Sequence, residues 1–203
     1  MYDSRSGLTL VRQGVYKADI AVITPYMGQL QLLRKKMSAM YEIFVNDRDL
    51  AEIEALEASK ARDDDKAAEL PPRAKVQKTT PLNSVRIATV DNFQGEEAKV
   101  VVVSLVRSNN AQNVGFLRTS NRINVLLSRA RHALYLTGNA KTYQTIPMWQ
   151  DVIGMLRENS NFARSFELQC PRHMDTSLVV SQPDDFVLLS PESGCSLPCK
   201  KRL

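Results

Sequence analysis

Two short segments carry side chains that could bind a nucleotide. The first, "DNFQGEE" at residues 91–97, lies between two apolar runs and contains Asp91, Gln94, Gly95 and Glu97. Carboxylate and amide oxygens can accept hydrogen bonds from ribose hydroxyls, and a glycine lets the backbone approach a ligand closely. The alternative is a plain loop in which Asp91 caps a short turn. Spacing alone does not separate these two interpretations.

The second segment, "RINVLLSRAR" at residues 122–131, supplies two arginines and a hydroxyl. If residues 120–132 form one helix, Arg122 and Arg129 lie two turns apart on roughly one face, with Ser128 beside them. Arginine binds phosphate through a planar, permanently charged fork. An arginine aimed at a transferring phosphoryl group stabilises the charge of the transition state. The alternative is that these arginines only solvate an exposed helix face.

The surrounding pattern alternates apolar strands with amphipathic helices. Buried strands are predicted at residues 18–26, 85–90, 99–106 and 133–138, and helices at 27–40, 120–132 and 148–159. This alternation favours an α/β fold with a parallel sheet covered by helices on both faces. Ligands of such sheets bind at the carboxyl ends of the strands. We therefore expect the strand at 85–90 to deliver residues 91–97 to that edge.

Residues 42–84 interrupt the alternation. Between residues 42 and 69 the chain has ten acidic and four basic residues, and a proline-containing basic stretch, "PPRAKVQKTTPLN", follows. Such a charged run forms a polar helix or a solvated linker. We expect residues 42–84 to be a surface insertion on the α/β core.

Composition sets weaker limits. The net charge of +5 and the pI of about 9.2 hint at a polyanionic partner, although charge this modest is also common in proteins without one. No apolar run reaches the roughly 18 residues that span a bilayer, and the first residues lack a signal-peptide pattern. The expectation is an intracellular protein of the cytoplasm or nucleus with no membrane partner.

Three longer segments in a fixed order carry a family resemblance. They are "IAVITPYMGQ", "VRIATVDNFQGEEAKVVVVSLVRSN" and "GFLRTSNRINVLLSRARHALYLTGN". They resemble motifs IV, V and VI of superfamily 1 helicases, in the 1B group that contains the RNA helicase of nonsense-mediated decay and senataxin-like enzymes. The resemblance covers residues 18–160. It implies that residues 1–165 form a three-layer RecA-like domain of the P-loop NTPase type, the second of the two domains that close on ATP in this family.

The resemblance also implies roles for individual residues. Arg129 is similar to the catalytic arginine that contacts the γ-phosphate, and Glu97 to the residue that contacts the nucleotide sugar. Gln94, Gly95 and Arg122 belong to the same nucleotide-binding motifs. Residues near the nucleic-acid strand correspond here to Thr24, Pro25, Thr89 and Val90. Contact with single strands in such enzymes is mostly to the sugar-phosphate backbone.

Other parts of the family's ATP-hydrolysing machinery are not found in the sequence. There is no G-x-x-x-x-G-K-[ST] loop and no carboxylate pair for magnesium, which position the phosphates and the metal. The resemblance thus implies that ATP and Mg²⁺ bind jointly with an N-terminal RecA-like domain, and that the chain alone does not hydrolyse ATP. The expected partner is single-stranded RNA. The alternatives are a DNA-directed helicase of the same superfamily and a non-catalytic RecA-like module that binds RNA or protein.

Residues 166–203 are expected to form an irregular tail. Cys170 and His173 have C-x-x-H spacing, and Cys195 and Cys199 form a C-x-x-x-C pair. Four such ligands in two close pairs suit tetrahedral Zn²⁺. The tail resembles the start of the cysteine-rich region in helicases with NFX-type zinc fingers. The alternative is that the cysteines are ordinary thiols.

Overall fold

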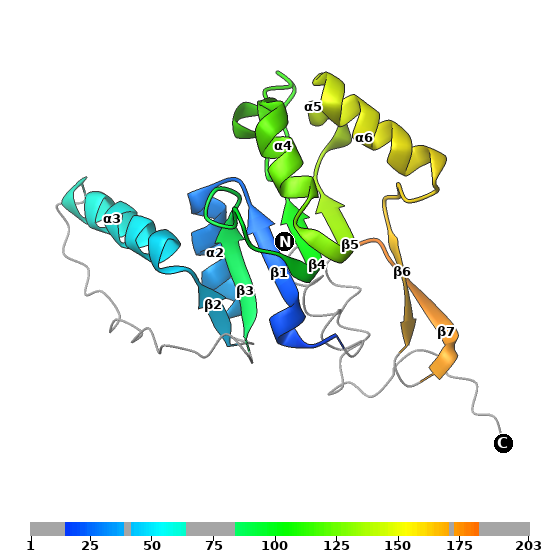
Figure 1. Cartoon of the computed structure of the whole chain (residues 1–203), viewed down its shortest axis with the longest axis horizontal. Helices are drawn as coiled ribbons and strands as arrows, with labels where there is room; N and C mark the ends of the chain where they lie inside the picture. Colours follow the sequence, from blue (N-terminus) through cyan, green and yellow to red (C-terminus); the bar gives the residue numbers. More distant parts are fainter. Residues whose placement is uncertain (1–14, 39–41, 64–83, 171–172, 183–203) are drawn as a thin grey trace.

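The computed structural model describes residues 15–38, 42–63, 84–170 and 173–182. Its centre is a five-stranded sheet in which every neighbouring pair is parallel. The strands are β1 (Ile20–Thr24), β2 (Ile43–Val45), β3 (Val85–Thr89), β4 (Ala98–Ser104) and β5 (Ala130–Thr137), in the spatial order β2-β3-β1-β4-β5. The first strand of the sequence therefore lies in the middle of the sheet (Figure 1).

Two hydrophobic clusters fill the two faces of this sheet. Because side chains alternate along a strand, Ala21 and Ile23 of β1 join one cluster, whereas Ile20 and Val22 join the other. On the first face lie α4 (Ser120–Leu127), α5 (Ala140–Tyr143) and α6 (Pro147–Glu158); on the second lie α2 (Met27–Met37) and α3 (Asp47–Asp63). The predicted three-layer RecA-like α/β class is confirmed.

The helices follow the predicted apolar spacing. Leu30, Leu33 and Met37 form the buried stripe of α2, which begins just after the strand-ending Thr24-Pro25 pair. In α6 the buried stripe comprises Trp149, Val152 and Ile153. Two short 3₁₀ turns, η1 (Lys17–Asp19) and η3 (Gly115–Arg118), precede β1 and α4. Within the described residues, no helix combines the length and apolar character needed to cross a membrane.

The predicted helix over residues 120–132 is too long. Helix α4 ends at Leu127, and β5 begins at Ala130. The amide of Ala98 donates to the carbonyl of Arg129 at 3.1 Å, so pairing with β4 starts immediately after the helix. A ladder of hydrogen bonds to a buried neighbour outweighs local helix propensity here.

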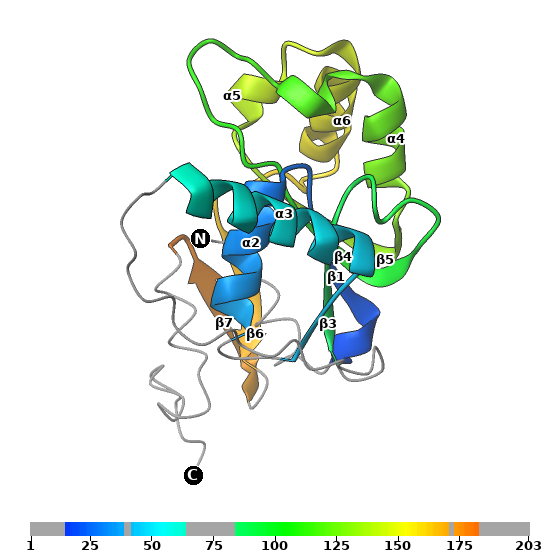
Figure 2. The ribbon, with the colours of Figure 1, turned by 90° about the vertical axis from the view of Figure 1, so that its left-hand side faces the viewer.

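The predicted surface insertion over residues 42–84 is wrong for its first part. Strand β2 pairs with β3 and completes the sheet at that edge. Helix α3 follows and buries Ile53 against the second hydrophobic cluster, while Val45 of β2 joins the same cluster. Figure 2 shows α3 beside α2. The apolar residues that carry this packing are few and widely spaced, so the dominant acidic pattern concealed them. Residues 64–83 lie outside the described part of the chain.

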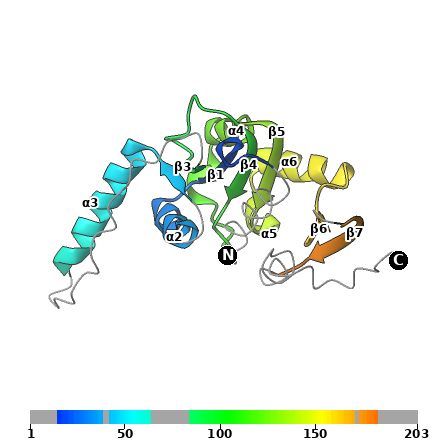
Figure 3. The same ribbon diagram turned by 90° about the horizontal axis from the view of Figure 1, so that it is seen from below.

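The predicted irregular tail is also wrong for its first part. Strands β6 (Phe166–Cys170) and β7 (His173–Val180) form an antiparallel two-stranded sheet. Figure 3 shows this hairpin next to the end of α6, apart from the five-stranded sheet. The segment "FELQC" does alternate apolar and polar residues, which is the period of a strand.

Candidate functional site

The loop between β3 and β4 runs from the carboxyl ends of the strands, here called the carboxyl edge of the sheet, to their amino ends, the amino edge. Thr89 at the end of β3 is level with Thr24 at the end of β1, whereas Val100 of β4 is level with Ile20 at the start of β1. Since the strands are parallel, residues 90–97 run from the carboxyl edge back to the amino edge. Phe93, midway along, is buried in the first hydrophobic cluster.

This path corrects the expected placement of the first motif. Asp91 lies beside the carboxyl edge, but Glu97 directly precedes Ala98 at the amino end of β4. The prediction that Asp91, Gln94, Gly95 and Glu97 all meet at the carboxyl edge is therefore wrong. Periodicity identifies a strand and its end, but it does not say how the following loop returns. The apolar Phe93 is the one residue of the segment 91–97 that suggests a crossing instead of an exposed turn.

Arg129 joins the amino end of this loop. Its guanidinium donates from Nη1 to the carbonyl of Glu96 at 3.2 Å, from Nε to the carbonyl of Val125 at 2.7 Å, and from Nη2 to Ser128 Oγ at 2.7 Å. Ser128 Oγ in turn donates to Val125 O. Arg129 is half-buried, whereas Ser128 is exposed. The loop of residues 90–97 and Arg129 thus form one contiguous group.

The two glutamates of the loop differ in availability. Glu96 forms an ion pair with Arg86 of β3, and that guanidinium also lies 5.7 Å from the centre of the Phe93 ring. Glu97 is exposed and makes no hydrogen bond or ion pair with any described residue. The backbone groups on either side of Glu97, the carbonyl of Glu96 and the amide of Ala98, are both hydrogen-bonded to Arg129. An exposed carboxylate at this position can accept hydrogen bonds from a ligand. Glu96 instead fixes the loop to the sheet.

The remaining residues of the turn shape the backbone. Gln94 is exposed, and its backbone N–H donates to the carbonyl of Asp91 at 3.3 Å. Gly95 has φ +86°. This left-handed conformation is strained for any residue with a Cβ. The glycine therefore permits the turn that brings the chain back toward β4.

The four residues predicted to contact nucleic acid lie together at the carboxyl ends of β1 and β3. All of them are buried: Thr24 is 0% exposed, Val90 1% and Thr89 8%, and Pro25 is also buried. The amide of Val90 donates to Thr24 O at 3.1 Å, and Thr24 Oγ1 has no hydrogen-bond partner among the described residues. The surface at this edge of the sheet is therefore formed by their exposed neighbours.

Arg122 is one such neighbour and is not grouped with Arg129. It lies in the first turn of α4, where its guanidinium is 3.8 Å from the Phe116 ring centre and its Nε is 4.0 Å from Asp91 Oδ1. Arg129 follows the end of α4, at the opposite edge of the sheet. The prediction that the two arginines share one helix face is wrong, because the helix stops before the second one.

Sequence reasoning missed a buried carboxylate next to the first motif. Asp49, in the first turn of α3, accepts hydrogen bonds from Thr89 N at 3.2 Å, Thr89 Oγ1 at 2.7 Å and Asn92 Nδ2 at 2.7 Å. It is 0% exposed. Asp47 and Asp49 both precede the apolar positions of the same helix, and no local pattern distinguishes them. Only the pairing of β2 with β3 brings Asp49 to Thr89.

A second missed cluster surrounds Tyr26. The hydroxyl of Tyr26 donates to Val114 O at 3.1 Å and accepts from Phe116 N at 3.3 Å. The guanidinium of Arg107 lies 5.1 Å from the centre of the Tyr26 ring. Gly115, with φ +66°, passes so close that an added Cβ would lie 2.8 Å from the hydroxyl. This cluster ties the loop after β4 to the start of α2.

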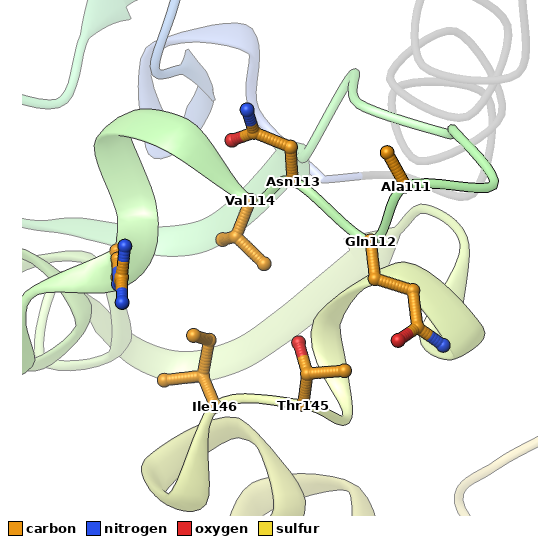
Figure 4. Close-up of a pocket in the computed structure, with 7 residues that line it drawn as sticks. Ala111, Gln112, Asn113, Val114, Thr145 and Ile146 are labelled. Carbon is orange, nitrogen blue, oxygen red and sulfur yellow. The ribbon is translucent and has the colours of Figure 1, made fainter.

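A separate pocket of about 370 Å³ lies near the start of α6. Figure 4 shows Val114, Thr145 and Ile146 around the same space, from two segments distant in sequence. Its lining contains none of the residues predicted to bind nucleotide, nucleic acid or metal. The full lining consists of Ala111, Gln112, Asn113, Val114, Arg118, Thr145 and Ile146.

The predicted zinc ligands are only partly within the described residues. Cys170 and His173 are paired in register at one end of the β6–β7 hairpin, whereas Cys195 and Cys199 lie outside the described residues. Among the described residues, no group of three or more His, Cys, Asp or Glu side chains could hold a metal ion. The zinc site stays a prediction.

Comparison with known proteins identifies the family of this chain. The family model described as an AAA domain matches residues 6–141, which is more than half of the chain. The chain belongs to this family. It is a superfamily 1B helicase domain of the C-terminal RecA-like type, as the three motifs and the parallel sheet indicate.

Similar proteins include one from an animal, one from an amoeba and one from a fission yeast. NFX1-type zinc finger-containing protein 1 of Homo sapiens is 46% identical over 119 residues, which cover 59% of this chain and 6% of that protein. Regulator of nonsense transcripts 1 of Dictyostelium discoideum is 40% identical over 90 residues, or 42% of this chain and 7% of that protein. Helicase required for RNAi-mediated heterochromatin assembly 1 of Schizosaccharomyces pombe is 48% identical over 73 residues, which cover 36% of this chain and 7% of that protein. The chain thus spans a small part of each relative's length.

Proposed function

We propose that this chain supplies one half of the ATP site of an RNA helicase motor and contacts single-stranded RNA. The observation that carries the proposal is the hydrogen bond from Arg129 Nη1 to Glu96 O. It brings the arginine of motif VI and the loop of motif V together at the amino edge of the sheet. The relatives named for nonsense transcripts and for RNAi-mediated assembly support RNA as the polymer.

Arg129 has the geometry for the phosphate-binding role. A guanidinium carries five N–H donors, and three of them are already used within the protein. The two remaining donors are free to bind the γ-phosphate. Because its protein contacts hold the side chain in place, little conformational freedom is lost when phosphate binds. Such an arginine stabilises transition-state charge on the transferring phosphoryl group.

Glu97 is assigned to the nucleotide sugar, with Gln94 and Gly95 in the same loop. Its exposed carboxylate can accept hydrogen bonds from ribose hydroxyls beside Arg129. The triphosphate and Mg²⁺ would be held mainly by a P-loop domain, with this chain closing the site from the other side. Arg122 faces the carboxyl edge, so we assign it to the polyanion-facing surface instead of the nucleotide site.

The RNA strand is assigned to the carboxyl edge of the sheet. Residues 85–150 carry eight basic and three acidic side chains, and backbone phosphates are neutralised by such an excess. Since Thr24, Pro25, Thr89 and Val90 are buried, they act by shaping this edge. Backbone groups and exposed side chains around them, Arg122 included, make the contacts.

The test is ATP hydrolysis by a protein that carries this chain after a P-loop RecA-like domain. Arg129→Ala should reduce RNA-stimulated turnover by roughly 10³- to 10⁵-fold. Arg131→Ala removes an exposed arginine two residues further along and serves as the matched control. Arg129→Lys keeps the charge but loses the fork, so it should remain severely impaired. Normal turnover in Arg129→Ala would refute the assignment.

Two further measurements separate the alternatives. The isolated chain should show no ATP hydrolysis; RNA-stimulated turnover by the isolated chain, abolished by Arg129→Ala, would contradict the half-site proposal. Binding to RNA and DNA oligonucleotides of the same length at one stated salt concentration distinguishes an RNA motor from a DNA-directed one. RNA binding without turnover in the two-domain protein would favour the non-catalytic module.

A further inference from the structure

The buried carboxylate of Asp49 has no part in the ATP site described above. We propose that Asp49 is a positioning residue: it holds the carboxyl-edge end of the loop of residues 90–97 in the shape that binds a single strand. This inference rests on the proposed function for its RNA readout. It also makes a structural claim that does not depend on RNA.

Asp49 contacts this end of the loop at three points. Oδ2 accepts from the backbone amide of Thr89, while Oδ1 accepts from both Thr89 Oγ1 and Asn92 Nδ2. Thr89 Oγ1 then accepts from the backbone amide of Asn92 at 3.4 Å. The last residue of β3 and the first turn of the loop are thus held by one carboxylate, which comes from 40 residues earlier in the chain.

The carboxylate is itself fixed by the core. Helix α3 is anchored by Ile53, 0% exposed, and it follows β2, which is paired with β3. No described Lys, Arg or His forms an ion pair with Asp49. A buried charge is tolerated only while hydrogen bonds satisfy it, and hydrogen bonds to an ionised group are stronger than neutral ones. Thr89 and Asn92 are therefore held more firmly than a neutral side chain could hold them.

The loop is held separately at its other end. There Glu96 pairs with Arg86, and its carbonyl accepts from Arg129. Loss of Asp49 should consequently release the carboxyl-edge end, where the RNA strand is assigned, and leave the amino-edge group in place. A change confined to one end of an eight-residue loop is a specific expectation that general destabilisation does not share.

The first experiment measures amide hydrogen exchange in the purified 203-residue chain. Asp49→Asn keeps the shape of the side chain but places its NH₂ donor against one of the groups that donate to Asp49 in the unsubstituted chain. Exchange of the Thr89 and Asn92 amides should accelerate at least tenfold, while Val101 and Val103 in the interior strand β4 stay unchanged. Asp47→Asn is the matched control, with the same charge change in the same turn at an exposed position.

The second experiment measures binding of a fluorescently labelled oligouridylate by anisotropy titration of the same chain. Asp49→Asn should raise the dissociation constant about tenfold, with an unchanged binding-competent fraction. A purely structural role would instead lower that fraction and leave the dissociation constant of the remainder unchanged. Asp47→Asn should behave like the unsubstituted chain, whereas Thr89→Val, which removes the hydroxyl that donates to Asp49, should resemble Asp49→Asn.

The outcomes distinguish the two proposals. If the unsubstituted chain does not bind the oligonucleotide, the RNA assignment fails, and hydrogen exchange alone decides whether Asp49 holds the loop. If exchange at Thr89 and Asn92 is the same in Asp49→Asn and Asp47→Asn, the positioning role is refuted. It is equally refuted if RNA binding is normal in the unsubstituted chain and the dissociation constant does not change in Asp49→Asn.

Discussion

Gly115 provides the sharpest test of the packing around Tyr26. Both Gly115 and Gly95 have positive φ, at +66° and +86°, but their surroundings differ. A Cβ added at Gly95 would meet nothing within 4 Å, whereas one at Gly115 would lie 2.7 Å from Arg107 Cζ and 2.8 Å from the Tyr26 hydroxyl. The two glycine-to-alanine substitutions therefore share a backbone cost, and only one of them adds a collision.

The expected costs follow from these contacts. An L-residue in the left-handed region costs about 1–2 kcal/mol, partly offset by about 0.5 kcal/mol from the stiffer unfolded chain. Gly95→Ala should therefore lower the free energy of unfolding by about 1 kcal/mol. Gly115→Ala must also displace the Tyr26 hydroxyl, which makes two hydrogen bonds, at about 1 kcal/mol each. Its total cost should be about 3 kcal/mol.

Urea unfolding followed by tryptophan fluorescence measures both costs, because Trp149 is the chain's one tryptophan and is 1% exposed. Substituting Tyr26→Phe removes the hydroxyl, and the other colliding atoms belong to the end of the flexible Arg107 side chain, which can shift at little cost. In that background Gly115→Ala should therefore cost little more than Gly95→Ala. This double-mutant cycle isolates the contact. Equal costs for the two glycines, or a Gly115→Ala cost unaffected by Tyr26→Phe, would refute the reasoning.

Three further outcomes are expected. Ile53→Ala should lower the free energy of unfolding by about 2–4 kcal/mol, and Leu56→Ala on the exposed side of α3 by much less; equal costs in urea titrations would show that α3 does not pack as described. Burial raises the pKa of the Tyr143 hydroxyl, which donates to Leu105 O at 2.6 Å. The folded chain thus keeps a proton that the unfolded chain releases above pH of about 10, so stability should fall as pH rises beyond that value, by up to about 1.4 kcal/mol per pH unit. Tyr143→Phe should remove this part of the pH dependence, and an identical pH dependence in both chains would contradict it. Elemental analysis should find stoichiometric zinc that is lost in Cys195→Ser, and a metal-free chain with unchanged urea stability would count against the zinc site.

The sequence predicted β1, β3, β4 and β5 because these strands are nearly continuous apolar runs, but it missed the short strand β2. Residues 99–106 illustrate this: a strand buried on both faces needs no partner to be recognised. The junction after α4 was less predictable. "SRARHAL" is compatible with a helix, and only the neighbouring β4 selects extended backbone from Ala130 onward. Tertiary pairing, absent from local periodicity, made that choice.

The site divides in the same way between local and long-range information. The family resemblance selected Glu97 and Arg129, and the structure places them in one group at the amino edge. The family resemblance did not indicate that the loop of residues 90–97 runs back across the sheet. Nor did it indicate that Asp49 holds the carboxyl-edge end of this loop. Both facts depend on strand order, since β1 lies between β3 and β4, and β2 lies beyond β3. A single sequence records which residues form strands more clearly than it records their order.

The position of β1 also bears on how the chain is made. Ile20 pairs with Val100, so one edge of the central strand stays open until some 80 further residues have been synthesised. At about 5–20 residues per second, that interval lasts roughly 4–16 s. During it, an apolar strand with unpaired edges is exposed at the ribosome, and such edges invite association with other chains. We therefore expect the strand order that unites the site to leave one edge of β1 open to association, or to chaperone binding, until β4 emerges.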